Sequence, residues 1–160
     1  MKTILAPVDF SRATDAVVEE AAALARAQSG RVVLLAIIQP PVIAQEYAPV
    51  IENLDEITAA SAEQTARQLA EIERNLQAER IATASVQLLG SPIALIVEQA
   101  KKFGADYIVM GSHGHTALYD LLVGSTTHGV LMRAPCPVVI IPAAKHAQPR
   151  KALKAPAAPA

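Results

Sequence analysis

Short aliphatic runs alternate with helical patterns along most of this chain, and this alternation constrains the fold more than any other feature of the sequence. Apolar runs with the length of buried strands occur at 3–8, 31–38, 83–89, 106–110 and 137–142. Apolar residues at helical spacing occupy the intervals 12–28, 55–80, 92–103 and 125–133. Strands that alternate with helices are connected by right-handed crossovers and run parallel to one another. The sequence therefore predicts an α/β fold with an open five-stranded parallel sheet and helices on both faces.

Composition agrees with strands that are buried on both faces. Of the 160 residues, 52% are hydrophobic and only 3% are aromatic, so the core must consist mainly of Val, Ile, Leu and Ala. No apolar run approaches the ~20 residues of a membrane-spanning helix, and Met1-Lys2 leads directly into a strand pattern without the apolar core of a signal peptide. We therefore expect one cytoplasmic domain over residues 1–142. Within it, Ser11 is expected to cap the first helix, and Ile57 to lie on the buried stripe of the second.

Charge is distributed unevenly. Residues 143–160 contain four basic side chains and no acidic one, whereas residues 1–142 contain 10 basic and 15 acidic side chains, a net charge of −5. An acidic body without a basic stripe argues against nucleic acid as the main partner. The Ala/Pro/Lys-rich segment 143–160 has no periodicity and is predicted to be a disordered tail.

A glycine-rich stretch after the fourth strand pattern carries the strongest functional signal. Gly111-x-x-Gly114 follows the strand directly, nine residues intervene, and Gly124-Ser125-Thr126 opens a helix. An isolated Gly-x-x-Gly is usually a turn. Here the glycines permit close approach of a ligand, and the amides, hydroxyls and dipole of a helix start favour an anion. The pattern is neither a dinucleotide fingerprint nor a Walker A loop, so we interpret it as a phosphate-binding loop without a loop lysine.

Three strand ends are expected to surround this loop. Asp9 stands at the end of the first strand, Ile37 and Ile38 end the second, and Gly111 ends the fourth. In open α/β sheets, ligands bind beyond the carboxyl ends of the strands, where the strand order reverses. The sequence thus predicts one crevice with the glycine loop on one side and Asp9 and Ile37 on the other.

Taken together, these blocks resemble the universal stress protein family. The matching segments, in the family's order, are Pro7-Val8-Asp9-x-Ser11, Ala105 to Gly114, Gly124-Ser125-Thr126 and Ala134 to Val139. The resemblance covers residues 2–142 and implies an adenine-nucleotide-binding fold with strand order 3-2-1-4-5, and usually a homodimer. The sequence is similar to the ATP-binding branch of this family, because the full Gly-x-x-Gly-x9-Gly-Ser/Thr pattern is present.

The resemblance also implies roles for individual residues. Asp9 matches an aspartate near the ribose, with a turn or cap aspartate as the alternative, and backbone at Ile37 would meet adenine. The segment from Gly111 to Gly114 would approach the ribose and phosphates, and Gly124-Ser125-Thr126 would bind the β- and γ-phosphates. Mg²⁺ would be held mainly by phosphates and water. The expected cofactor-binding residues are Pro7, Val8, Asp9, Ile37, Met110, Gly111, Ser112, His113, Gly114, Gly124, Ser125 and Thr126.

Catalysis and metal binding are the less favoured interpretations. No general base is identified and the loop contains no lysine or arginine, so the predicted function is an ATP-binding stress-response sensor or regulator with at most slow hydrolysis. The rival is a structural or interaction module of the same fold whose loop is empty or binds only anions. His113, His115 and His128 superficially suggest a metal site, but we favour a loop histidine near phosphate and two partly exposed histidines.

Two further expectations concern the end of the domain. In the resembling strand order, residues 138–141 form an edge strand, whose unpaired backbone groups favour pairing with a second copy in a two-fold homodimer. The single cysteine, Cys136, cannot form an intrachain disulfide and is expected to be a small core residue rather than a redox centre.

Overall fold

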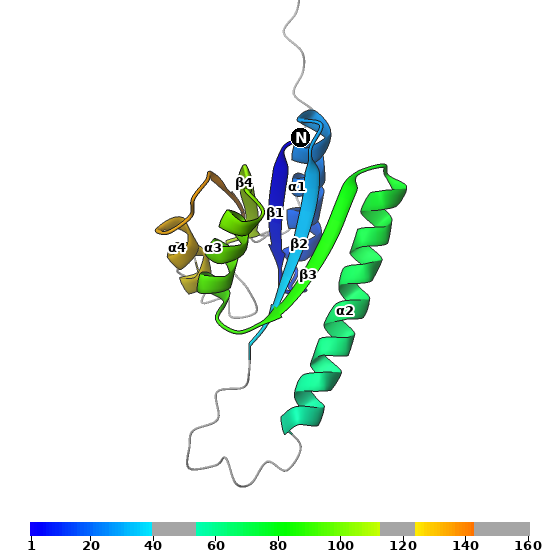
Figure 1. The fold of residues 1–160 in the computed structure, drawn as a ribbon, viewed down its shortest axis with the longest axis vertical. Coiled ribbons are helices and arrows are strands. Elements are labelled where there is room, and N and C mark those ends of the chain that lie inside the picture. The colour runs from blue at the N-terminus through cyan, green and yellow to red at the C-terminus, as the bar shows by residue number, and fades with distance from the viewer. Residues whose placement is uncertain (40–53, 113–123, 143–160) are drawn as a thin grey trace, which may run out of the picture.

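The computed structural model describes residues 1–39, 54–112 and 124–142, with side chains from residue 56 onward in the second range. Five strands form one parallel sheet in the order β3-β2-β1-β4-β5 (Figure 1). The strands are β1 (Thr3–Val8), β2 (Arg31–Ile38), β3 (Ala82–Leu89), β4 (Tyr107–Gly111) and β5 (Val138–Ile141). The helices are α1 (Thr14–Ala27), α2 (Leu54–Ala78), α3 (Pro92–Lys102) and α4 (Ser125–Leu131). The predicted fold class and strand order are confirmed, whereas the predicted tail 143–160 lies outside the described residues.

Each face of the sheet has its own hydrophobic core, because alternate residues of a strand point to opposite faces. The core beneath α1 and α2 includes Ile4, Ala6, Val17, Leu69, Leu76 and Val109. The core beneath α3 and α4 includes Leu5, Val33, Ile96, Ile108, Met110 and Val130. The central strands β1 and β2 are therefore covered on both sides, as their aliphatic sequences require. None of the helices in the described part of the chain combines the length and the apolar character of a membrane-spanning segment.

Two expectations about the helices are wrong. Ser11 does not cap α1, which begins three residues later at Thr14 with Ala13 as its N-cap residue and no side-chain cap. The Ser11 hydroxyl instead accepts a hydrogen bond from the Ala13 N–H at 3.4 Å, within the preceding turn. Ile57 is 57% exposed, whereas Leu69 and Leu76 of the same stripe are buried. Helical spacing identified the correct face of α2 but not how much of that face the sheet covers.

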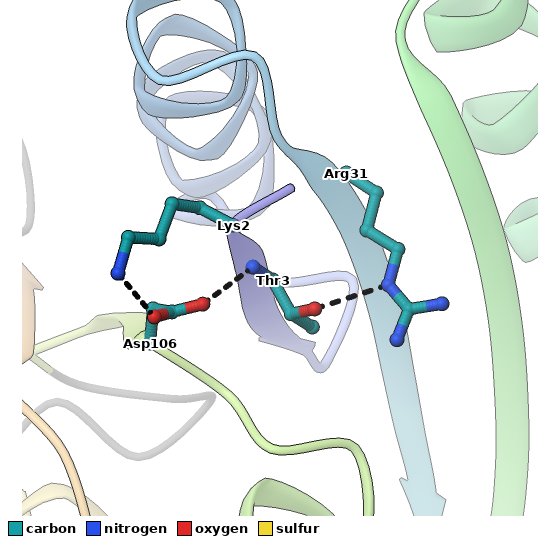
Figure 2. Close-up of polar contacts among 4 residues, drawn as sticks. All are labelled: Lys2, Thr3, Arg31 and Asp106. Carbon is teal, nitrogen blue, oxygen red and sulfur yellow. Dashed lines mark hydrogen bonds and ion pairs between the residues drawn. The ribbon is translucent and has the colours of Figure 1, made fainter.

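The end of the sheet where the strands begin is held by polar contacts around Asp106 (Figure 2). Its carboxylate accepts hydrogen bonds from Lys2 Nζ at 2.7 Å and from the Thr3 N–H at 2.8 Å. Arg31 Nε donates to Thr3 Oγ1 at 3.0 Å. These residues stand at or beside the first positions of β4, β1 and β2, so the contacts join the starts of the three central strands. The ammonium of Lys2 and then the amide of Thr3 lower the pKa of Asp106 below its ordinary 3.8, and Asp106 raises the pKa of Lys2 above 10.5.

Acid is expected to abolish the contribution of Asp106 to stability. Because the folded-state pKa is lowered, the contribution is present above the ordinary value of 3.8 and is lost as the pH falls through the folded pKa. Asp106→Asn keeps an acceptor for Thr3 but removes the charge, so it should lower the melting temperature at pH 7, and this difference from wild type should shrink as the pH falls below 3.8. Thermal melts across this range at low salt measure the effect, and Lys2→Met should reproduce it. A melting-temperature difference between Asp106→Asn and wild type that stays constant with pH would contradict this role of the Asp106 charge.

Candidate nucleotide-binding site

The sheet provides a switch point between β1 and β4. β1 pairs with β2 on one side and with β4 on the other. After β1 the chain continues into α1, which packs on one face of the sheet, whereas α4, the next described element after β4, packs on the opposite face. Crevices that bind ligands form beyond the strand ends at such a divergence. The predicted site residues of β1 and β4 therefore lie at the position where this fold class binds its ligands.

Predicted site residues lie at the ends of three neighbouring strands. Val8 is opposite Ala36 in the last pair of the β1–β2 ladder, and Asp9 and Ile37 are the residues that follow this pair. The β1–β4 ladder pairs Ile4 with Tyr107 and Leu5 with Ile108, and Gly111 ends β4. These strand ends form the rim of the sheet at the switch point.

The two ends of the predicted phosphate loop are hydrogen-bonded to each other. The Gly124 N–H donates to the Ser112 carbonyl oxygen at 2.7 Å, and the Ser112 N–H donates to the Ile141 carbonyl at 2.8 Å. Thr127 Oγ1 donates to the Gly111 carbonyl at 2.8 Å and lies 3.4 Å from the Ser112 carbonyl. The loop thus starts and ends at one junction of β4, α4 and β5. Residues 113–123, including the predicted site residues His113 and Gly114, lie outside the described residues.

Thr127 is the residue of this junction that sequence reasoning missed. The motif directed attention to Gly124-Ser125-Thr126 and stopped one residue short. Thr127 is 3% exposed and lies one turn before the fully buried Val130. Helical spacing back from Val130 was therefore a signal that Thr127 faces inward, although nothing local indicated which acceptors it would meet.

Helix α4 is short and is held close to α3. It ends at Leu131, two residues before the predicted Arg133, and Gly124 is its N-cap residue. A Cβ atom at Gly129 would lie 2.5 Å from Ile93 Cδ1, so this glycine permits the close approach of α4 to α3. With seven residues, α4 has only a small dipole, and any phosphate here would depend on amides and hydroxyls. The Gly124 amide is already bonded to Ser112, which leaves Ser125, exposed, and Thr126, partly buried, as the predicted phosphate contacts.

Asp9, predicted to line the crevice opposite the glycine loop, lies in a tight turn after β1. Its Oδ1 accepts from the Ser11 N–H at 3.0 Å, the turn role that remained open as an alternative. The next residue, Phe10, has φ of 58°, a left-handed conformation that costs a non-glycine residue about 1–2 kcal/mol. Phe10 also packs against the first core, and this packing helps to offset the cost. Strained backbone of this kind is concentrated at functional sites, and the turn keeps Asp9 exposed at the strand end.

The side chains of the remaining predicted residues in β1, β2 and β4 are buried or partly buried. Val8 and Met110 are buried, and Met110 packs in the second core, so neither side chain is available to a ligand. Ile37 is partly buried and packs against the same core. Pro7 is partly buried within β1. Their positions still place main-chain atoms of three strands around the switch point.

A cavity of about 230 Å³ between α1 and α2 is separate from this crevice. It is lined by residues that include Asp15, Glu19, Arg26, Ile72 and Glu79, and by none of the predicted site residues. Arg26 forms an ion pair with Glu79, so the remaining charge of the lining is acidic. An acidic lining does not favour a phosphate group, and this cavity therefore does not compete with the crevice as an anion site.

The described residues contain no cluster of three or more His, Cys, Asp or Glu side chains that could hold a metal ion. His128 is exposed on α4, whereas His113 and His115 lie outside the described residues. Cys136 is partly buried against the second core. Burial, followed by the charge of Asp106, raises the pKa of its thiol above 9.0, which reduces the thiolate fraction. Both observations fit its predicted role as a small core residue.

A parallel sheet whose order reverses between β1 and β4, with β4 and α4 joined at a hydrogen-bonded junction, defines a class of nucleotide-binding-like α/β domains. The chain belongs to the universal stress protein family, whose profile matches residues 1–142.

Individual relatives match over nearly their whole length. Universal stress protein MJ0577 of Methanocaldococcus jannaschii is 27% identical over 152 residues, covering 88% of this chain and 94% of the relative. The solved structure of MJ0577 gives a TM-score of 0.79 at 28% identity and covers 90% of this chain and 97% of that one. UspA from Lactobacillus plantarum gives 0.77 at 27% identity, with coverages of 88% and 97%.

Two more distant structures share the fold and contain ligands of their own. A universal stress protein in complex with cAMP has a TM-score of 0.62 at 21% identity, covering 88% of this chain and 95% of that one. The protein from Archaeoglobus fulgidus in complex with dAMP has a TM-score of 0.61 at 22% identity, with coverages of 88% and 97%.

Proposed function

We propose that this chain is an ATP-binding universal stress protein that acts as a nucleotide-dependent sensor or regulator. The observation that carries the proposal is the junction of the loop ends, in which the Gly124 N–H and the Ser112 carbonyl lie 2.7 Å apart. It joins the two halves of the glycine pattern beside the switch point. The cAMP and dAMP complexes of distant members support an adenine nucleotide as the class of ligand.

The proposed arrangement follows the row of strand ends. Adenine would lie against the backbone at Ile37, and the ribose hydroxyls would be near the exposed carboxylate of Asp9. The phosphates would lie over Gly111 to Gly114 and meet the amides and hydroxyls of Ser125 and Thr126. Mg²⁺ would be held mainly by phosphate oxygens and water, because the protein supplies hydroxyl and backbone groups there.

Binding without rapid turnover is the expected behaviour. No lysine or arginine occurs between Met110 and Thr126 to stabilise charge on a transferring phosphoryl group. Asp9, the predicted carboxylate of the site, accepts a hydrogen bond from the Ser11 amide. Among the residues that the structure describes, these features would supply contacts to a bound nucleotide but no arrangement that activates water. We therefore propose at most slow ATP hydrolysis.

Calorimetry with Mg-ATP tests the proposal. Wild-type protein stripped of nucleotide should bind ATP saturably, whereas Gly114→Val should lose most of the affinity, because a branched side chain blocks close approach of phosphate. Gly104→Asn is the matched control, since a Cβ there meets nothing within 4 Å and asparagine tolerates the φ of 57°. Mass spectrometry of nucleotide released from the purified protein gives an independent readout.

The alternative is a structural or interaction module of the same fold. It would leave wild type and Gly114→Val equally unable to bind ATP, with no adenine nucleotide released on denaturation. That pair of results would overturn the proposal, and ATP turnover at the rate of ordinary ATPases would overturn its non-enzymatic part.

The proposal includes a homodimer. Among the described residues, β5 pairs only with β4, so its other side is an open edge. All four residues of β5 are aliphatic and only partly buried, and Met132, at the end of α4, is 72% exposed. The other edge strand, β3, is less suited, because Thr83, Ser85 and Gln87 form polar contacts with α2.

A further inference from the structure

The hydroxyl of Thr127 is a polar group in an otherwise apolar setting. It lies on the buried face of α4, where Val130 packs into the second core and Gly129 meets Ile93 of α3. Valine has nearly the same shape as threonine and would fill this position equally well. A buried hydroxyl is unfavourable unless it is hydrogen-bonded, so its two carbonyl acceptors are the feature that requires threonine here.

Both acceptors belong to the start of the loop. Gly111 is the last residue of β4, and its carbonyl lies 2.8 Å from Thr127 Oγ1. Ser112 follows, and its carbonyl also accepts the Gly124 N–H at 2.7 Å. The Thr127 hydroxyl thus adds a side-chain bond from inside α4 to a junction that would otherwise depend on backbone contacts alone.

We propose that Thr127 is a positioning residue of the nucleotide site, which holds the two loop ends together before nucleotide binds. The inference rests on the proposed function for its ligand. Because Ser112 and Gly124 are already held in place, they lose less conformational freedom when a ligand binds beside them, and the affinity is correspondingly higher. Thr127 acts through the carbonyls of Gly111 and Ser112 and does not itself contact the nucleotide.

Three variants separate this role from a general loss of stability. Thr127→Val removes the hydroxyl and keeps the shape, and it should weaken Mg-ATP binding about tenfold, the effect of losing one buried hydrogen bond. Thr127→Ser keeps the hydroxyl and should bind nearly as wild type does. Thr83→Val is the matched control, because it removes a threonine hydroxyl that donates to the Ile81 carbonyl at 3.0 Å, at the start of β3. It should leave ATP affinity unchanged.

Amide hydrogen exchange supplies a readout that does not need the nucleotide. In the ligand-free protein, Thr127→Val should speed exchange of the Gly124 amide by severalfold, whereas Thr127→Ser and Thr83→Val should not. ATP affinity of Thr127→Val equal to wild type, or unchanged exchange at Gly124, would overturn the positioning role. Wild type without ATP affinity would overturn the proposed function and the nucleotide part of this inference, while faster exchange would still support the tie between the loop ends.

Discussion

Gly30→Ala is expected to lower the free energy of unfolding by about 1–3 kcal/mol, the usual cost of forcing extra atoms into a packed site. Gly30 lies between α1 and β2, where a Cβ atom would be 2.6 Å from the carbonyl oxygen of Lys2 and 3.0 Å from Ile4 Cδ1. The Lys2 oxygen is a backbone atom that accepts the Arg31 N–H at 2.8 Å. It cannot move aside without disturbing the start of the β1–β2 ladder. Urea denaturation of the nucleotide-free protein measures the loss.

Gly104→Ala is the control for this prediction. Gly104 has φ of 57° but no atom within 4 Å of a Cβ, so alanine adds backbone strain without a clash. The expected cost is about 1 kcal/mol, from the left-handed conformation alone. A cost for Gly30→Ala no greater than for Gly104→Ala would show that the close contact with Lys2 does not limit stability.

Ile140→Pro is expected to convert the proposed homodimer into a folded monomer. The carbonyls of Pro137 and Ile141 accept hydrogen bonds from the N–H of Ile108, within β4, and of Ser112, directly after it. Because alternate residues of a parallel strand bond to the same neighbour, the N–H of Ile140 points toward the open edge. Proline removes that donor and is tolerated at an edge, so pairing with a second copy should be lost while the β4–β5 ladder remains. Light scattering at micromolar protein concentration measures the change.

The adjacent position distinguishes edge pairing from damage to the sheet. The N–H of Val139 points toward β4 by the same alternation, so Val139→Pro should destabilise the fold itself. Circular dichroism should therefore show native structure in Ile140→Pro and a lowered melting temperature in Val139→Pro. A monomeric wild type would contradict the dimer, and a dimeric Ile140→Pro would place the interface away from the β5 edge.

The strands followed closely from local sequence, whereas their order was implied by the family resemblance. The ranges predicted for β1 and β2 agree with the observed Thr3–Val8 and Arg31–Ile38, because short aliphatic runs with clear stops leave little choice of boundary. The predicted start of α1 was wrong, because the turn at Phe10 delays the helix to Thr14. No local sequence pattern indicates that a phenylalanine will adopt a left-handed conformation. The prediction that Ile57 is buried was wrong, because its burial depends on which elements extend over that end of α2.

The candidate site shows the same division. Glycine spacing and strand ends predicted the loop and its neighbours, and the register pairs Val8 with Ala36, the residues directly before Asp9 and Ile37. The nucleotide roles of these residues stay predictions. Thr127 was missed because its hydroxyl meets a carbonyl 16 residues away, and no periodicity encodes a contact of that separation.

Local patterns thus specified the class of fold and the end of the sheet where a ligand would bind, and the family resemblance implied the strand order. Tertiary structure decided how that end and the opposite end of the sheet are held together. Three contacts join residues that are distant in sequence: the hydrogen bond of Gly124 to Ser112, that of the Thr127 hydroxyl to Gly111, and the ion pair of Lys2 with Asp106. Hydrogen bonds depend on distance and direction in space, and only the packed sheet brings these donors and acceptors within reach.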